Sequence, residues 1–95
     1  MKGSSIDDLK AGMKVVQETE RVLRGPIETD EEILAVVAGC AKTFDTIIPL
    51  YIAMQRHVQC VDASHEYVET AKAFLKSYDS CTKALASVVE KLKKQ

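Results

Sequence analysis

The sequence predicts an all-α fold, an antiparallel up-down helical bundle of three helices, and two observations support this prediction. Apolar side chains recur at alternating steps of four and three along most of the chain, which is the spacing that lines up one face of an α-helix. Residues that start and stop helices divide this pattern into segments at about 6–24, 30–62 and 65–93. A length of 95 residues fits one helical-bundle domain, 1–95.

The first predicted helix, about 6–24, has a clear start and a clear end. Ser5 can act as its N-cap, and Asp8 follows three residues later in a variant of the capping box. Gly25 can take the left-handed conformation that ends many helices, and Pro26 cannot extend a helix. We therefore place a helix end at residue 24.

The second predicted helix, about 30–62, starts with the capping box Thr29-Asp30-Glu31-Glu32. Pro49 lies off the apolar face of this helix, where water can satisfy the carbonyl groups that proline leaves unpaired. We predict one helix kinked at Pro49, and the alternative is a four-helix bundle with a break at Pro49. The apolar face comprises Ile33, Val37, Cys40, Phe44, Ile47, Tyr51, Met54, Val58 and Val61.

The third predicted helix, about 65–93, is indicated by a change of phase. The register of the second helix does not continue past Val61, and the next apolar face is shifted by one residue. Asp62-Ala63-Ser64 can form the turn, with Ser64 or Asp62 as the next N-cap. The alternative, one very long helix with a stutter, would force dimerisation. The new face comprises Tyr67, Ala71, Phe74, Tyr78, Cys81, Leu85, Val88 and Leu92.

Composition and charge argue against several classes of function. The net charge is −1, from 13 basic and 14 acidic residues, so we expect no nucleic-acid partner. The longest apolar run, Ile47 to Met54, is far shorter than the roughly 20 residues of a membrane helix, so we expect no membrane span. The N-terminus lacks the apolar core of a signal peptide. Three cysteines without a CxxC pair indicate a reducing compartment, and we expect a cytoplasmic protein.

Helix lengths suggest where a partner could bind. The second and third helices are about 45 Å long and the first about 30 Å, so the first cannot cover the whole of the longer pair. We expect apolar side chains to be exposed where the second and third helices meet, forming a non-enzymatic helical interaction module. Its partner would be a protein, either a second copy in a homodimer or a helix of another protein. The predicted partner-binding residues are Tyr51, Met54, Val58, Val61, Tyr67 and Phe74.

No catalytic, cofactor or metal site is predicted. His57 and Cys60 lie one helical turn apart, as two metal ligands would. A closed zinc site needs four ligands, and the neighbouring candidates do not share that face. A Cys–His nucleophile pair would need a cleft and an oxyanion hole, which a packed bundle without glycine-rich loops does not provide.

Ser64-His65-Glu66, followed by Thr70, resembles the phospho-accepting segment of sensor histidine kinases, in which a histidine followed by an acid lies on a helix. Tyr67, Val68 and Glu69 stand where that family has an arginine and a Thr-Pro pair. The resemblance implies an alternative function, a histidine phosphotransfer-type four-helix bundle that uses His65. A further alternative is a structural fragment of a longer helical protein.

Overall fold

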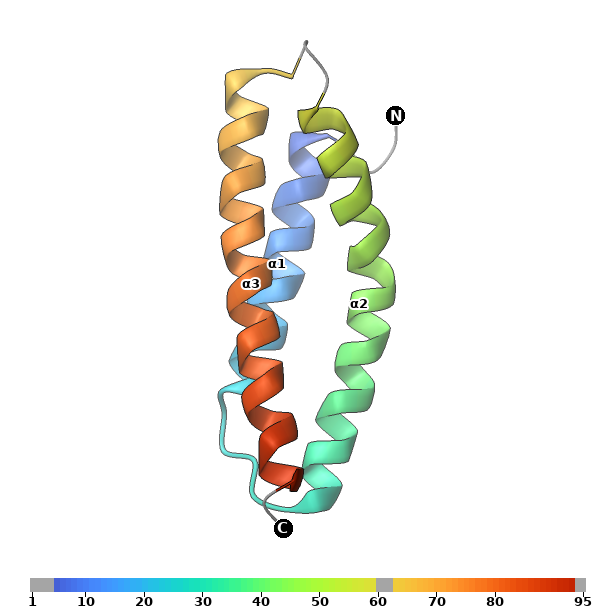
Figure 1. Ribbon diagram of the computed structural model, residues 1–95, viewed down its shortest axis with the longest axis vertical. Helices are drawn as coiled ribbons and strands as arrows, with labels where there is room; N and C mark the ends of the chain where they lie inside the picture. The colour runs from blue at the N-terminus through green and yellow to red at the C-terminus, as the bar shows by residue number, and fades with distance from the viewer. Residues whose placement is uncertain (1–4, 60–62, 94–95) are drawn as a thin grey trace.

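The three predicted helices are present in the computed structural model, which describes residues 5–59 and 63–93. They are α1 (Ile6–Leu23), α2 (Asp30–Val58) and α3 (His65–Lys93). Figure 1 shows that successive helices run in opposite directions along a rod measuring 50 × 19 × 18 Å. The predicted all-α up-down bundle is therefore confirmed.

The helix starts follow the predicted capping residues. The Ser5 side chain accepts a hydrogen bond from the Asp8 amide, and the Thr29 side chain accepts one from the Glu32 amide, each within a full capping box. Ser64 caps α3, because its hydroxyl accepts a hydrogen bond from the Tyr67 amide at 3.1 Å, and the other predicted candidate, Asp62, lies outside the described residues.

Pro49 lies inside a single helix, so the four-helix alternative with a break at this residue is wrong. Its side chain is exposed, as predicted, and Figure 1 shows α2 as a continuous, curved helix. The exposed position lets water reach the backbone carbonyl that proline leaves unpaired. α2 ends at Val58, before the predicted residue 62, and residues 60–62 lie outside the described part of the chain.

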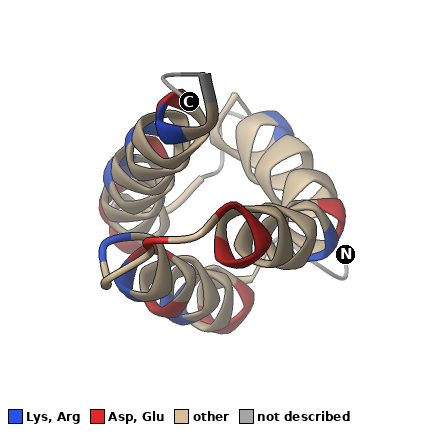
Figure 2. Cartoon of the chain, turned by 90° about the horizontal axis from the view of Figure 1, so that it is seen from below, with Lys and Arg blue, Asp and Glu red and all other residues tan. Residues whose placement is uncertain are grey.

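The core runs along the axis of the bundle and is built from the predicted apolar faces. Figure 2 looks along this axis and shows most charged residues on the outer sides of the helices. Ile27, from the segment between α1 and α2, is also buried and belongs to the core. The largest fully buried side chains are Phe74, Leu9, Ile33, Ile47, Met54, Val16, Val88 and Cys81.

The helices are not packed equally. α1 and α3 approach each other closely, whereas α2 makes fewer close backbone approaches to either neighbour. Side-chain hydrogen bonds also connect α1 to α3: the Ser80 hydroxyl donates to the Glu20 carboxylate at 2.6 Å, and Gln17 donates to Ser77 at 3.4 Å. α2 meets α3 partly through aromatic rings, since Tyr78 packs against Phe44 with ring centroids 5.6 Å apart.

Candidate interaction surface

The outward side of α2 carries a second set of apolar side chains. One residue beyond the buried face of α2, the chain again follows steps of four and three, and these positions are exposed. Leu34 is 58% exposed, and Ile48 and Ile52 are each 44% exposed. We call this set the outer stripe of α2. Its apolar members are Leu34, Ala38, Ala41, Ile48 and Ile52, and Asp45 is the one charged residue in the series.

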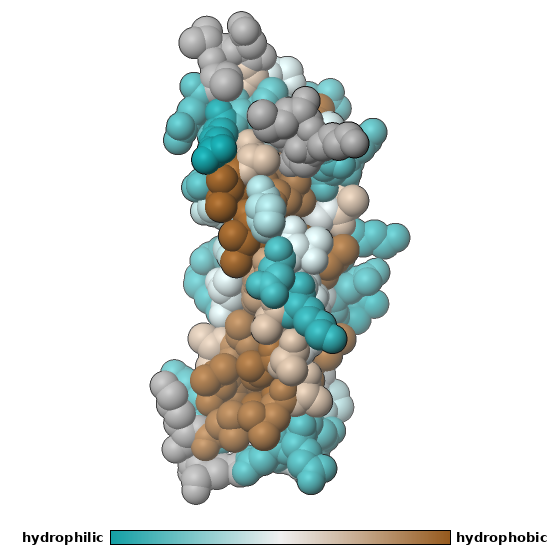
Figure 3. Space-filling model, turned by 90° about the vertical axis from the view of Figure 1, so that its right-hand side faces the viewer, coloured by the Kyte–Doolittle hydropathy of each residue, from teal (hydrophilic) through white to brown (hydrophobic). Residues whose placement is uncertain are grey.

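The outer stripe belongs to a helix that is apolar well beyond its buried face. Figure 3 shows the side of the molecule on which α2 lies, with a broad hydrophobic area over its lower part and a narrower one above. Among the described residues, α2 is long and apolar enough to cross a membrane, judged by length and composition alone, yet only 17% of its most apolar window is buried. The core helix of a globular bundle would be mostly buried, whereas α2 combines a buried apolar face with several exposed apolar side chains.

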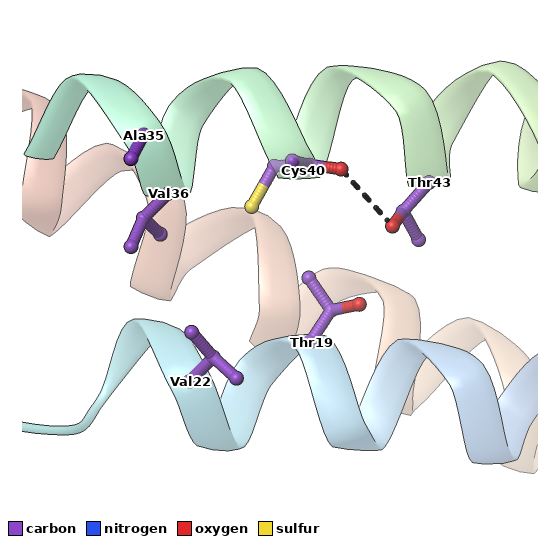
Figure 4. A pocket seen from close by; sticks show the side chains of 7 residues that line it. Thr19, Val22, Ala35, Val36, Cys40 and Thr43 are labelled. Atoms are coloured by element: carbon purple, nitrogen blue, oxygen red, sulfur yellow. Dashed lines mark hydrogen bonds between the residues drawn. The ribbon is translucent and has the colours of Figure 1, made fainter. Parts of the chain in front are cut away.

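A groove of about 350 Å³ lies between α1 and the N-terminal half of α2. Figure 4 shows Thr19 and Val22 of α1 facing Val36 and Thr43 of α2 across it. Both threonine hydroxyls donate to carbonyl groups of their own helices, Thr19 to Val15 at 2.9 Å and Thr43 to Gly39 at 3.2 Å. Because these donors are already bonded, the groove presents mainly methyl groups and the Cys40 thiol.

A second groove, of about 280 Å³, lies between the C-terminal half of α2 and the start of α3. Met54 and Val58 of α2 and Val68 and Leu75 of α3 are among its lining residues. This groove lies at the end of the bundle where the sequence predicts a partner-binding surface. Two of the predicted residues, Met54 and Val58, line it.

The predicted partner-binding residues are otherwise poorly placed for a partner. Met54, Tyr67 and Phe74 are at most 3% exposed and belong to the core, so the expectation that they are exposed is wrong. Tyr51 is half-buried, with its ring 5.0 Å from that of Tyr78. Of the two remaining predicted residues, Val58 is exposed and Val61 lies outside the described residues.

The position of α1 explains this correction. The start of α1 lies beside the end of α2 and the start of α3, so the short helix covers the end that was expected to be open (Figure 1). A side chain added at Gly12 would meet Leu50 and Phe74, which shows how closely α1 approaches both partners there. The region beyond the end of α1 is the opposite end, where the N-terminal half of α2 has Leu34 and its neighbouring alanines exposed.

The sequence did contain a signal for the outer stripe. From Ile33 to Ala41 no residue is charged, so this part of the helix is apolar on every side rather than on one face. A search for one buried helix face finds the residues from Ile33 to Met54 that point into the core, and it does not detect the outer stripe one residue further along.

Hydrogen bonds and burial shift the pKa of several titratable groups in the bundle. Hydrogen bonds from Ser80 and Arg24 hold the pKa of Glu20 below its ordinary value. Burial raises the pKa of the Tyr67 hydroxyl, which has no hydrogen-bond partner among the described residues and lies beside the His57 ring. Within residues 5–59 and 63–93, no group of three or more histidine, cysteine or acidic side chains is placed to hold a metal ion.

His65 is the first residue of α3, and its side chain is exposed. It lies at the end of the bundle and directly follows the capping residue Ser64. Cys40 and Cys81 are free thiols in the core, and Cys60 lies outside the described residues.

Comparison with known proteins gives no relative: no family model matches the sequence, and neither the curated proteins nor the solved structures contain a match. The arguments about function therefore depend on the surface of this chain itself.

Proposed function

We propose that this protein is a non-enzymatic helical interaction module that binds a protein partner through the outer stripe of α2. The observation that supports this proposal is the exposure of Leu34, Ile48 and Ile52 on one side of a single helix. Several large apolar side chains exposed along one helix of a small bundle favour an interface at that helix.

The chemistry of the stripe suits a helical partner. Ala38 and Ala41 lie between the large side chains, and small residues let a second helix approach closely enough for ridges to enter grooves. Fully burying a leucine or isoleucine contributes about 1.5–3 kcal/mol, so covering three half-exposed side chains contributes a few kcal/mol. Association costs about 4–15 kcal/mol in lost translational and rotational freedom, so these three side chains supply part of the binding energy and the surrounding contacts must supply the rest.

The experiment compares two lysine substitutions of similarly exposed residues. Ile48 on the outer stripe is 44% exposed, and Val15 on α1 is 42% exposed, so Ile48→Lys and Val15→Lys add the same charge at similar exposure. The tagged full-length chain and both variants serve as bait for partners, copies of itself included, with circular dichroism as the control for folding. We expect Ile48→Lys to lose a partner that the wild-type chain and Val15→Lys retain.

The proposal is wrong if no protein, including a second copy, distinguishes Ile48→Lys from Val15→Lys. If α2 instead spanned a membrane, the chain would partition into detergent or lipid, and no protein partner would be lost in Ile48→Lys alone. The charged outer sides of α1 and α3, which flank α2, favour the protein partner (Figure 2).

One observation favours a second candidate function, phosphotransfer through His65. Its side chain is exposed, as a phospho-accepting histidine must be. Incubation with a small phosphoryl donor should then give an acid-labile phosphate that is lost in His65→Gln. His57→Gln is the matched control, because His57 is half-buried against the Tyr67 ring, with centroids 4.1 Å apart.

A further inference from the structure

The charges of α2 are distributed so that they select one kind of partner. Its first turn contains Asp30, Glu31 and Glu32, and its last turn contains Arg56 and His57. Between these turns, the exposed charged residues of α2 are Lys42 and Asp45, close to the middle of the helix. The helix is therefore acidic at its start, basic at its end, and has one charge of each sign at its centre.

This order of charges along α2 is complementary to the same order read in the opposite direction. If two copies of α2 lie antiparallel with their centre near residue 43, Lys42 of each copy lies opposite Asp45 of the other. The acidic first turn of each copy then lies beside the basic last turn of the other. A parallel arrangement in register would instead place like charges together at both ends and at the centre, which costs several kcal/mol.

The apolar side chains fit nearly the same register. The Lys42–Asp45 pairing sets the centre between residues 43 and 44, so Leu34 lies within one residue of the position opposite Ile52 of the other copy, and Ala38 lies within one residue of the position opposite Ile48. Large residues thus meet large residues at the two ends of the stripe, and Ile48 packs on an alanine nearer the centre. A two-fold arrangement uses the same surface on both copies, which is the usual geometry of a homodimer.

We infer that the outer stripe of α2 binds a second copy of this chain, with the two α2 helices antiparallel and Lys42 paired with Asp45 of the other copy. This inference rests on the proposed function and names its partner. Antiparallel helix dipoles also favour the arrangement.

The available area sets the strength of the dimer. A helix of 29 residues is about 44 Å long and about 10 Å wide, so α2 offers a strip of roughly 440 Å² on each copy. The two copies together then bury roughly 880 Å², which is below the roughly 1,200 Å² or more of a stable specific interface and in the range of weak, transient contacts. The dimer is therefore reversible and dilutes to monomer.

The test is the mass of the full-length chain, measured by sedimentation equilibrium over a wide range of concentrations. We expect a monomer–dimer equilibrium that Lys42→Glu and Asp45→Lys each weaken by about tenfold or more, because each places like charges across the two-fold axis. The double variant Lys42→Glu/Asp45→Lys restores opposite charges at both crossings and should recover most of the wild-type dimerisation. Circular dichroism checks that helical content is unchanged.

Three outcomes would overturn the inference. A wild-type chain that stays monomeric at every concentration excludes the dimer. A double variant that dimerises no better than either single variant excludes the Lys42–Asp45 pairing. A monomeric chain that co-sediments with phosphatidylcholine vesicles would make the outer stripe a lipid-binding surface.

Failure of the dimer is distinguishable from failure of the proposed function. The wild-type chain could be monomeric and yet bind a different protein that Ile48→Lys loses and Val15→Lys retains. That result would support the interaction module and exclude only the second copy as its partner. Loss of the dimer in Ile48→Lys alone supports both proposals.

Discussion

α1 and α3 form one half of this bundle and α2 forms the other. The two halves differ in how closely their helices pack and in which side chains they expose. α1 and α3 pack closely, join through the Glu20–Ser80 hydrogen bond and carry charged outer sides. α2 packs less closely and exposes Leu34 and Ile48. α1 also exposes Val15 and Val22, so the two halves differ in how many large apolar side chains they expose, and α2 exposes more of them. A helix that packs loosely and exposes apolar side chains indicates a surface kept for something outside the monomer.

The largest expected effect tests the close packing of α3. Phe74 is fully buried, so Phe74→Ala should lower the free energy of unfolding by about 3–5 kcal/mol through the cavity it leaves. Its neighbour Leu75 is 38% exposed, and Leu75→Ala should cost about 1 kcal/mol or less. Urea denaturation measures both. Equal losses would mean that the two sides of α3 are packed alike, contrary to the structure.

The fold was predictable because its signals are local. Ser5 and Thr29 each begin a capping box, and the shift of the apolar register between Val61 and Tyr67 marks the turn before α3. Each signal involves residues within one or two helical turns. Local hydrogen bonds and side-chain spacing therefore predict the three helix starts and the end of α1, but not the end of α2, which the sequence places at about residue 62 and the structure at Val58.

The site was less predictable because it depends on where α1 lies along the longer pair. The lengths show that α1 leaves part of the hairpin uncovered, but not which part. In the structure, the segment between α1 and α2 extends past the end of α1 (Figure 1), and its residue Ile27 is buried in the core. α1 consequently covers Met54 and Phe74, and the exposed apolar residues belong to the second register of α2.

The next prediction concerns pH and the core between the helices. Burial, with smaller contributions from Cys40 and Glu20, raises the pKa of the Cys81 thiol from 9.0 to about 11. Below pH 9 the thiol is protonated in both the folded and the unfolded chain, so its stabilisation is fully present. As the pH rises from 9 to 11, the unfolded chain loses this proton first, and about 2–3 kcal/mol of stability should be lost.

The measurement compares urea denaturation of the wild-type chain and Cys81→Ala across this pH range. The difference in slope isolates the thiol from lysines and tyrosines that titrate nearby. Equal slopes would show that the Cys81 thiol ionises as readily in the folded chain as in the unfolded one, so that the core there is open to water.

The smallest expected effects come from two glycines inside helices, and they compare the two halves directly. A Cβ atom at Gly12 in α1 would meet Leu50 and lie 3.1 Å from the Phe74 ring, whereas a Cβ atom at Gly39 in α2 would have nothing within 4 Å. Alanine gains up to about 1 kcal/mol over glycine in a helix interior, and overpacking costs about 1–3 kcal/mol. Gly12→Ala should therefore lower the free energy of unfolding by about 1 kcal/mol, and Gly39→Ala should raise it by about 0.5–1 kcal/mol. Thermal and urea denaturation of both variants at low protein concentration decide the signs. If Gly12→Ala is as stabilising as Gly39→Ala, the Leu50 and Phe74 side chains yield easily, and α1 is no more tightly held than α2.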